Sequence, residues 1–178
     1  IISPADSLET VKALEAAVKS NNPSYLRLTG SSNNPIIYSK DYEFKIGKSI
    51  TLKEGKDVTI FCAGAMVYQC LEAAKILESM GFSIEVIDLI SLSPMDEETI
   101  IKSVQKTKKV IIVDEDYPRC SISADISALI SEQAFDYLDA PPKRLNPPHT
   151  PVPYSKPLEK LYAPDKETIV KNAQILLE

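Results

Sequence analysis

A chain of 178 residues has room for one full domain, or for one domain and part of another. Hydrophobic residues make up 44% of the sequence and charged residues 25%, and the net charge of -5 argues against binding to nucleic acid or to a membrane surface. No apolar run approaches the ~18 residues that a membrane-spanning helix needs, and the start lacks the pattern of a secretory signal.

Cysteine, histidine and glycine are too few or too scattered for a familiar catalytic site. Cys62, Cys70 and Cys120 are odd in number and form no CxxC pair, so we expect reduced thiols and a cytoplasmic protein. The single histidine, His149, lies among prolines and is accompanied by no GxSxG motif, which favours a structural role and not a general base or zinc ligand. Five glycines without GxGxxG or GxxxxGK[ST] argue against a complete nucleotide site.

The first residues are typical of the end of a buried strand. The chain opens with Ile1, Ile2 and Ser3 and has no initiating methionine, which favours a truncated or proteolysed chain. A natural amino-terminal strand left by processing is the alternative. Asp6 and Glu9 then have the spacing of a capping box and predict the start of a helix.

That helix is predicted to pack one apolar face on a sheet. Its apolar residues recur at helical spacing: Leu8, Val11, Leu14 and Val18. Residues 21–23 end the helix, and residues 25–28 resume an extended run. A strand, a helix and a strand in succession predict a pair of parallel strands.

Residues 30–41 read as a linker. They are rich in Ser, Asn and Pro and show no hydrophobic period. We therefore predict a domain boundary before Gly47, which divides the chain into residues 1–46 and residues 47–178.

The second part alternates buried strands with helices. Strands are predicted at residues 48–52, 58–62, 83–89 and 110–113, and helices at residues 66–80, from 96, at 121–133 and at 165–177. The proline-rich residues 140–157 are expected to be mostly extended. This alternation predicts an α/β fold with a three-layer open sheet, mostly parallel, with helices on both faces.

Three consecutive acids, Asp114, Glu115 and Asp116, follow the strand at residues 110–113. Acids at such a strand end form the magnesium pocket of response-regulator receivers, but there the acidic strand comes first in the domain. We interpret the three acids as loop residues that cap or solvate the strand end.

Several segments resemble one enzyme superfamily. Residues 2–4 with residues 21–23 resemble the tail of a transketolase-type pyrimidine-binding domain, and residues 46–60 resemble the entry to the transketolase carboxy-terminal domain. The segments VDEDYPRCSISADISALI (residues 113–130) and PPHTPVPYSKPLEKLYAPD (residues 147–165) resemble the β subunit of the decarboxylating component of 2-oxo acid dehydrogenase complexes. Acetoin, pyruvate and branched-chain members are the most similar.

The resemblance implies that the parent enzyme transfers an acyl group to lipoamide through thiamine diphosphate held with magnesium. The activating glutamate would lie upstream of Ile1, and the diphosphate motif would lie in the partner α subunit. We therefore assign no catalytic or cofactor-binding residue to this chain. It would serve assembly with an α subunit and a second β subunit, and the chain alone is expected to be inactive and to self-associate.

Two further sites follow from the resemblance alone. Some β subunits hold potassium at the turn that Ala17, Ser20 and Asn22 occupy here, and oxygen ligands suit such a cation. The family also docks its dihydrolipoamide acyltransferase on the carboxy-terminal domain, where the matching residues are Asp139 and the terminal Glu178. Plain solvation is the alternative interpretation at each position.

Two other functions remain open. Residues 25–30 are closer to transketolase-like chains, which favours the carboxy-terminal half of a transketolase or of a 1-deoxyxylulose-5-phosphate synthase. The compact alternation of strands and helices is also compatible with a free-standing α/β binding module.

Overall fold

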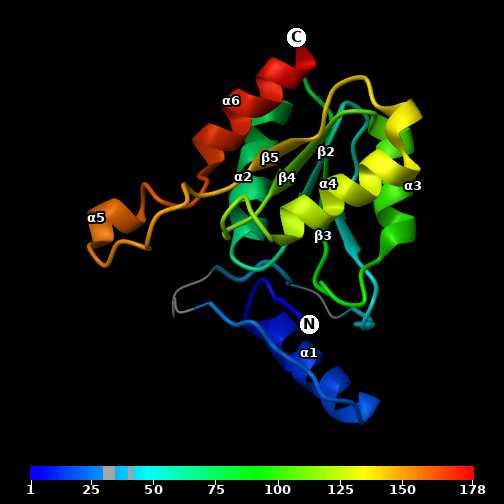
Figure 1. Cartoon of the computed structure of the whole chain (residues 1–178), viewed down its shortest axis with the longest axis vertical. Helices are drawn as coiled ribbons and strands as arrows, with labels where there is room; N and C mark the ends of the chain where they lie inside the picture. Colours follow the sequence, from blue (N-terminus) through cyan, green and yellow to red (C-terminus); the bar gives the residue numbers. More distant parts are fainter. Residues whose placement is uncertain (30–34, 40–41) are drawn as a thin grey trace.

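The computed structural model describes residues 1–29, 35–39 and 42–178, arranged around a five-stranded sheet (Figure 1). The strands are β1 (Ile50–Lys53), β2 (Val58–Cys62), β3 (Ile84–Asp88), β4 (Val110–Val113) and β5 (Lys143–Leu145). Their order is β1-β3-β2-β4-β5, with β1 antiparallel to β3 and every other neighbouring pair parallel. The predicted α/β fold with a mostly parallel sheet is thus confirmed.

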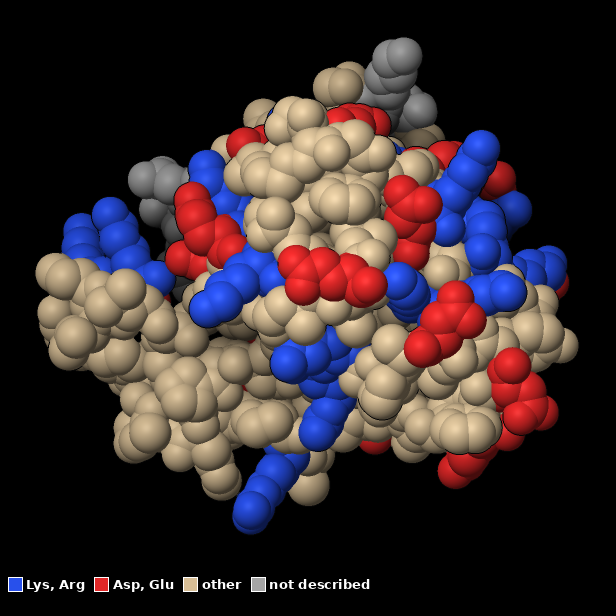
Figure 2. Space-filling model, turned by 90° about the horizontal axis from the view of Figure 1, so that it is seen from above, with Lys and Arg blue, Asp and Glu red and all other residues tan. Residues whose placement is uncertain are grey.

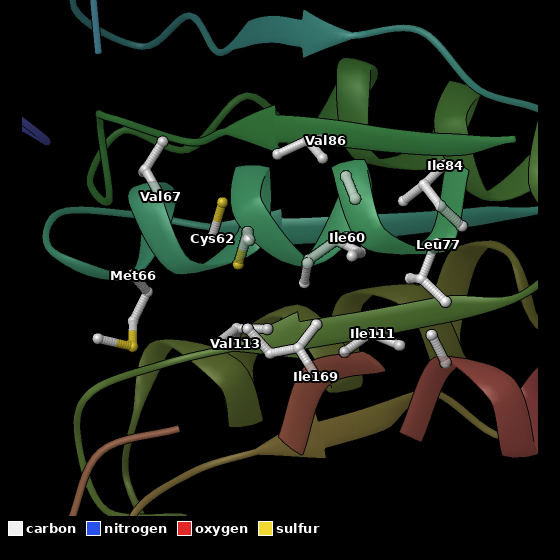
Figure 3. Close-up of a cluster of buried hydrophobic side chains, with 14 of the residues drawn as sticks. Ile60, Cys62, Met66, Val67, Leu77, Ile84, Val86, Ile111, Val113 and Ile169 are labelled. Carbon is white, nitrogen blue, oxygen red and sulfur yellow. The ribbon is translucent and has the colours of Figure 1, made fainter. Parts of the chain in front are cut away.

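Helices cover both faces of this sheet, as the alternating pattern predicts. Helices α2 (Met66–Ser79) and α6 (Lys166–Leu177) pack on one face, and α3 (Glu97–Thr107) and α4 (Ile122–Gln133) on the other. Figure 3 shows the first of the two cores, in which strand residues such as Ile60 and Ile111 meet Leu77 and Ile169 of the helices. Successive strand residues point to opposite faces, so the neighbouring Phe61 belongs to the second core.

Aspartates begin three of the helices. The side chain of Asp6 accepts a hydrogen bond from the backbone N–H of Glu9, and Asp165 accepts one from Thr168 at 2.8 Å. Asp96 begins α3 in the same way, and its second oxygen accepts from the backbone of Ser49 at 2.9 Å. Each such cap contributes about 1 kcal/mol to stability.

The amino-terminal segment is attached to the carboxyl end of β3. Ile2 forms a parallel bridge with Leu26 and an antiparallel bridge with Ser91, beside helix α1 (Ser7–Ser20). The two strands predicted around this helix are therefore single bridges. The parallel direction of the pairing is as predicted.

The prediction for the packed face of α1 is wrong at three of its four residues, since only Leu8 packs against the first core. Val11, Leu14 and Val18 are 55%, 55% and 73% exposed. The buried positions are instead Ala13 and Ala17, whose small side chains allow a close approach, and Glu9, whose carboxylate accepts hydrogen bonds from the Ala5 N–H and the Tyr42 hydroxyl. The larger apolar side chains form an outward stripe.

Three details complete the comparison with the predicted elements. The proline-rich residues 140–157 contain β5, which lies at the sheet edge, and the start of the short helix α5 (Lys156–Glu159). A 3-10 turn, η1 (Phe135–Tyr137), follows α4. Within the predicted linker, residues 35–39 have neither helix nor strand, whereas residues 30–34 and 40–41 lie outside the described residues.

No helix in the described part of the chain is long and apolar enough to cross a membrane.

Candidate functional site

A cavity of about 500 Å³ opens at the carboxyl ends of β2 and β4. Its floor is apolar and is formed by strand and helix residues of the second core, including Phe61, Ile112 and Ile126. The polar groups stand at the rim, and come from the loop after β4, from the start of α4, and from Ser3 and Arg27 of the amino-terminal segment. We call this space the strand-end cavity.

The acids after β4 have three different environments. Asp114 is buried, and its two oxygens accept the backbone N–H groups of Asp116 at 3.0 Å and Ser123 at 3.2 Å. Burial raises the pKa of the Asp114 carboxyl, although these hydrogen bonds oppose the rise. Glu115 forms an ion pair with Arg27, and Asp116 is exposed. The interpretation as capping and loop residues fits this arrangement.

Gly64 lets the amino-terminal segment lie against the strand-end cavity. Its φ is +56°, in the left-handed region, and its N–H donates to the carbonyl oxygen of Ser3 at 3.2 Å. A Cβ at this position would lie 2.7 Å from the Ser3 hydroxyl oxygen. A side chain there would therefore force Ser3 away.

A buried group of acids and tyrosines joins the amino-terminal segment to the sheet. The Tyr38 hydroxyl donates to Asp88 at 2.9 Å, and the Tyr42 hydroxyl donates to Glu9 at 3.0 Å. Burial raises the pKa of both carboxyls, that of Asp88 well above its ordinary value, with Glu9 adding charge repulsion. Sequence patterns missed this group because its members are far apart in the chain. The one local signal was the capping-box position of Glu9.

The structure brings Ala17, Ser20 and Asn22 together on the turn after α1. The Ser20 hydroxyl donates to the carbonyl of Ala17 at 2.8 Å, and the Asn22 amide donates to the carbonyl of Ser20 at 3.1 Å. Asn21 has a left-handed φ of 54° and closes the helix. The carbonyls of Ala17 and Ser20 thus accept hydrogen bonds within the turn, and potassium binding stays a prediction.

Asp139 and the chain terminus lie near each other at the opposite, amino end of the strands. Asp139 is exposed and shares a shallow hollow with Leu177, next to Glu178. The hollow is also bordered by lysines: Lys56, Lys106, Lys108 and Lys109. Figure 2, which views the molecule from above Figure 1, shows basic and acidic side chains interspersed over this end. Asp139 and Leu177, the residue before Glu178, thus border one hollow in a mixed charge environment.

The other sequence candidates are not brought into one site. Cys62 and Cys70 are buried free thiols, and Cys120 is exposed at the rim of the strand-end cavity. The ring of His149 packs on Tyr117, with centroids 4.9 Å apart. Among the described residues, no group of three or more His, Cys, Asp or Glu side chains could hold a metal ion.

The comparisons with known proteins agree on one family. The family model described as "Transketolase, C-terminal domain" matches residues 47–169. The acetoin:2,6-dichlorophenolindophenol oxidoreductase subunit beta of Bacillus subtilis is 42% identical over 174 residues, which are 95% of this chain and 50% of that protein. The mitochondrial pyruvate dehydrogenase E1 component subunit beta of Dictyostelium discoideum is 38% identical over 180 residues, which are 98% of this chain and 51% of that protein.

Solved structures agree. A split-gene transketolase, described as an inactive beta4 tetramer, has a TM-score of 0.87 at 30% identity over 99% of this chain and 56% of its own. The transketolase of Campylobacter jejuni shares the fold, with a TM-score of 0.64 at 19% identity over 98% of this chain and 26% of its own. The present chain spans about half the length of the curated relatives it matches.

Proposed function

Because the chain belongs to the transketolase C-terminal domain family, we propose that it is the carboxy-terminal part of a β subunit of a thiamine-diphosphate-dependent dehydrogenase that acts on a 2-oxo acid or on acetoin. The carrying observation is the identity of 42% to an acetoin oxidoreductase β subunit over 174 residues, which extends well beyond the matched domain. We assign residues 1–46 to the end of a pyrimidine-binding domain with its linker, and residues 47–178 to the carboxy-terminal domain.

The residues of this chain do not fit the diphosphate of the implied cofactor. The strand-end cavity has Asp114, Asp116 and Asp125 on its walls, and carboxylates repel an anionic diphosphate. We therefore derive no step of the reaction through this chain. We propose that this chain contributes to assembly by contacting an α subunit and a second β subunit. The active site itself would be formed by other parts of the enzyme.

Reconstitution tests this function. The chain joined to its upstream segment would be produced with a candidate α subunit, and reduction of 2,6-dichlorophenolindophenol by pyruvate, a branched-chain 2-oxo acid or acetoin would be measured. We expect activity that requires both subunits and thiamine diphosphate. Activity of the β chain without any α subunit would contradict the proposal.

A second candidate has its own support. The TM-score of 0.87 to a split-gene transketolase, over 99% of the chain, favours the carboxy-terminal half of a two-part transketolase. Transfer of a two-carbon unit between sugar phosphates, with no reduction of the dye in the presence of 2-oxo acid or acetoin, would select this candidate. Absence of any partner or activity for the longer chain would leave the free-standing binding module.

We also propose that the hollow around Asp139 docks an acyltransferase. Lys106 is already paired with Glu54 and Glu85, and the other three lysines of the hollow favour a partner that offers acidic groups as well as a basic group for Asp139. Replacing Asp139 with Asn is expected to raise the dissociation constant for the acyltransferase about two- to fivefold, since an exposed ion pair contributes about 0–1 kcal/mol. The exposed Asp136 is the control, and equal effects of the two replacements on the dissociation constant would refute the docking role.

Potassium at the turn of Ala17, Ser20 and Asn22 is a separate proposal, which rests on the resemblance and on the presence of the three residues in one turn. Thermal unfolding would be compared in potassium chloride and sodium chloride of equal concentration. We expect a higher midpoint in potassium that is lost in Asn22→Ala. Equal midpoints in the two salts would rule out a selective site.

A further inference from the structure

We propose that the strand-end cavity binds a small molecule with an aliphatic body and one amine-type cation. The first argument is its position. The chain leaves β2 through α2 toward β3, and leaves β4 through α4, on the opposite face, toward β5. Neighbouring strands whose connections diverge in this way leave a crevice outside their carboxyl ends, where open α/β sheets bind ligands.

The second argument is size and lining. A cavity of about 500 Å³ lies within the range of small-molecule sites, which are mostly apolar with a few polar groups. The buried floor at Phe61 and Ile112 continues into Leu92 and Ile122, which are only half-buried. This wall would take the body of a molecule the size of a branched aliphatic chain.

The third argument is that two backbone N–H groups an anion could use are already taken. The Gly64 N–H donates to Ser3, and the Ser123 N–H in the first turn of α4 donates to Asp114. A phosphate at this edge of the sheet usually occupies such groups. An anionic ligand would therefore have to displace bonds that the protein makes to itself.

The fourth argument is the charge that remains at the rim. Glu115 is paired with Arg27, and both oxygens of Asp114 accept backbone N–H groups. One oxygen of Asp116 accepts the backbone N–H of Tyr117 at 2.8 Å, so its other oxygen and the exposed carboxylate of Asp125 remain for a ligand. Counting the lining side chains as charged gives four acids against one cation, Arg27, a net charge of -3 that favours a cation.

The test uses the intact chain and 3-methylbutylamine as the probe, followed by isothermal titration calorimetry and by amide chemical shifts. The carboxylate analogue 3-methylbutanoate and inorganic phosphate are the comparison ligands. We expect saturable binding of the amine, with shifts at residues 112–126, and no saturable binding of either anion. Failure of the amine to saturate, or equal binding of 3-methylbutanoate, would overturn the proposal.

Variants separate a built site from general attraction to an acidic protein. The double variant Asp116→Asn/Asp125→Asn is expected to weaken amine binding about tenfold, since two rim carboxylates are removed. Asp136→Asn/Glu132→Gln changes the same number of exposed acids outside the cavity and should leave the dissociation constant unchanged. Equal weakening by the two double variants would refute the site. This test needs no α subunit, so its result is independent of the reconstitution experiment that tests the proposed function.

Discussion

Tyr38 and Asp88, 50 positions apart in the chain, share a buried hydrogen bond of 2.9 Å between hydroxyl and carboxyl. Asp88 ends β3, whereas Tyr38 precedes the first strand, so this bond ties the amino-terminal segment to the sheet. The second oxygen of Asp88 accepts the N–H of Ile90 at 3.1 Å.

Replacing Asp88 with Asn is expected to reduce the loss of stability at high pH. Burial raises the pKa of Asp88 in the folded state, so folding retains a proton that the unfolded chain releases above about pH 4. Stability therefore falls as pH rises from there through the folded-state pKa. Asn keeps the acceptor for Ile90 and offers its N–H₂ to the Tyr38 oxygen. Urea unfolding between pH 5 and pH 8 should show a flatter profile for the variant.

Glu9 has a raised pKa for the same reason, so part of the pH dependence should remain in Asp88→Asn. Tyr38→Phe serves as the control, with a loss of about 1 kcal/mol for a buried hydrogen bond. A pH profile of Asp88→Asn parallel to that of the parent chain would show that Asp88 does not carry the effect.

The ion pair between Arg27 and Glu115 is expected to stabilise the attachment of the amino-terminal segment. The two side chains are 35% and 19% exposed, so solvent screens the pair only in part. Arg27→Met should lower the free energy of unfolding by about 1 kcal/mol. A double-mutant cycle with Glu115→Gln measures the coupling. Strictly additive losses would mean that the pair contributes nothing.

Gly64→Ala should cost more than Gly81→Ala. Both glycines have positive φ, +56° and +94°, so each replacement incurs backbone strain of about 1–2 kcal/mol. Only the Cβ at position 64 meets an atom, the Ser3 hydroxyl oxygen, whereas nothing lies within 4 Å of the one at position 81. Adding Ser3→Ala to Gly64→Ala should recover part of the loss, as measured by chemical denaturation. No recovery would exclude the steric contribution.

The exposed stripe on α1 is expected to drive self-association. Val11, Leu14 and Val18 lie on one side of the helix without burial, and apolar surface of this kind associates with other surfaces. Val18→Lys should shift the chain toward monomer in sedimentation velocity at high concentration. Ile175→Lys, on the 61% exposed Ile175 of α6, is the matched control. A parent chain that is monomeric at every concentration would contradict this prediction.

Local patterns predicted the elements well because their signals lie within one turn. The cap at Asp6 and the helix starts at residues 96 and 165 were each visible from the chain alone, and Asp6, Asp96 and Asp165 each form a cap in the structure. Periodicity did not reveal which side of α1 is buried, since Val18 is apolar and yet exposed. Whether such a face is covered depends on partners that a pattern cannot specify.

Some features of the candidate sites could be predicted from the sequence, and others became visible only in the folded chain. Asp139 and Glu178 were identified only through resemblance, and the four lysines beside them become neighbours only in the folded chain. The strand-end cavity could not be foreseen, because it needs the diverging connections of β2 and β4 and the approach of Ser3 and Arg27. Its acids were noticed in sequence as a strand-end loop, which describes their backbone but not their surroundings.

The double bridging of Ile2 bears on how the molecule unfolds. Its amide is bonded to Tyr25, its carbonyl to Arg27, and the next amide, that of Ser3, to Ile90. These backbone hydrogen bonds hold the segment to the residues that follow β3. Its amides should therefore be protected from hydrogen exchange to the same extent as the amides of the sheet. The boundary before Gly47 would then separate two regions of sequence ancestry without dividing the cooperative unit, and the amides of Ile2 and Ser3 should exchange as slowly as those of β3.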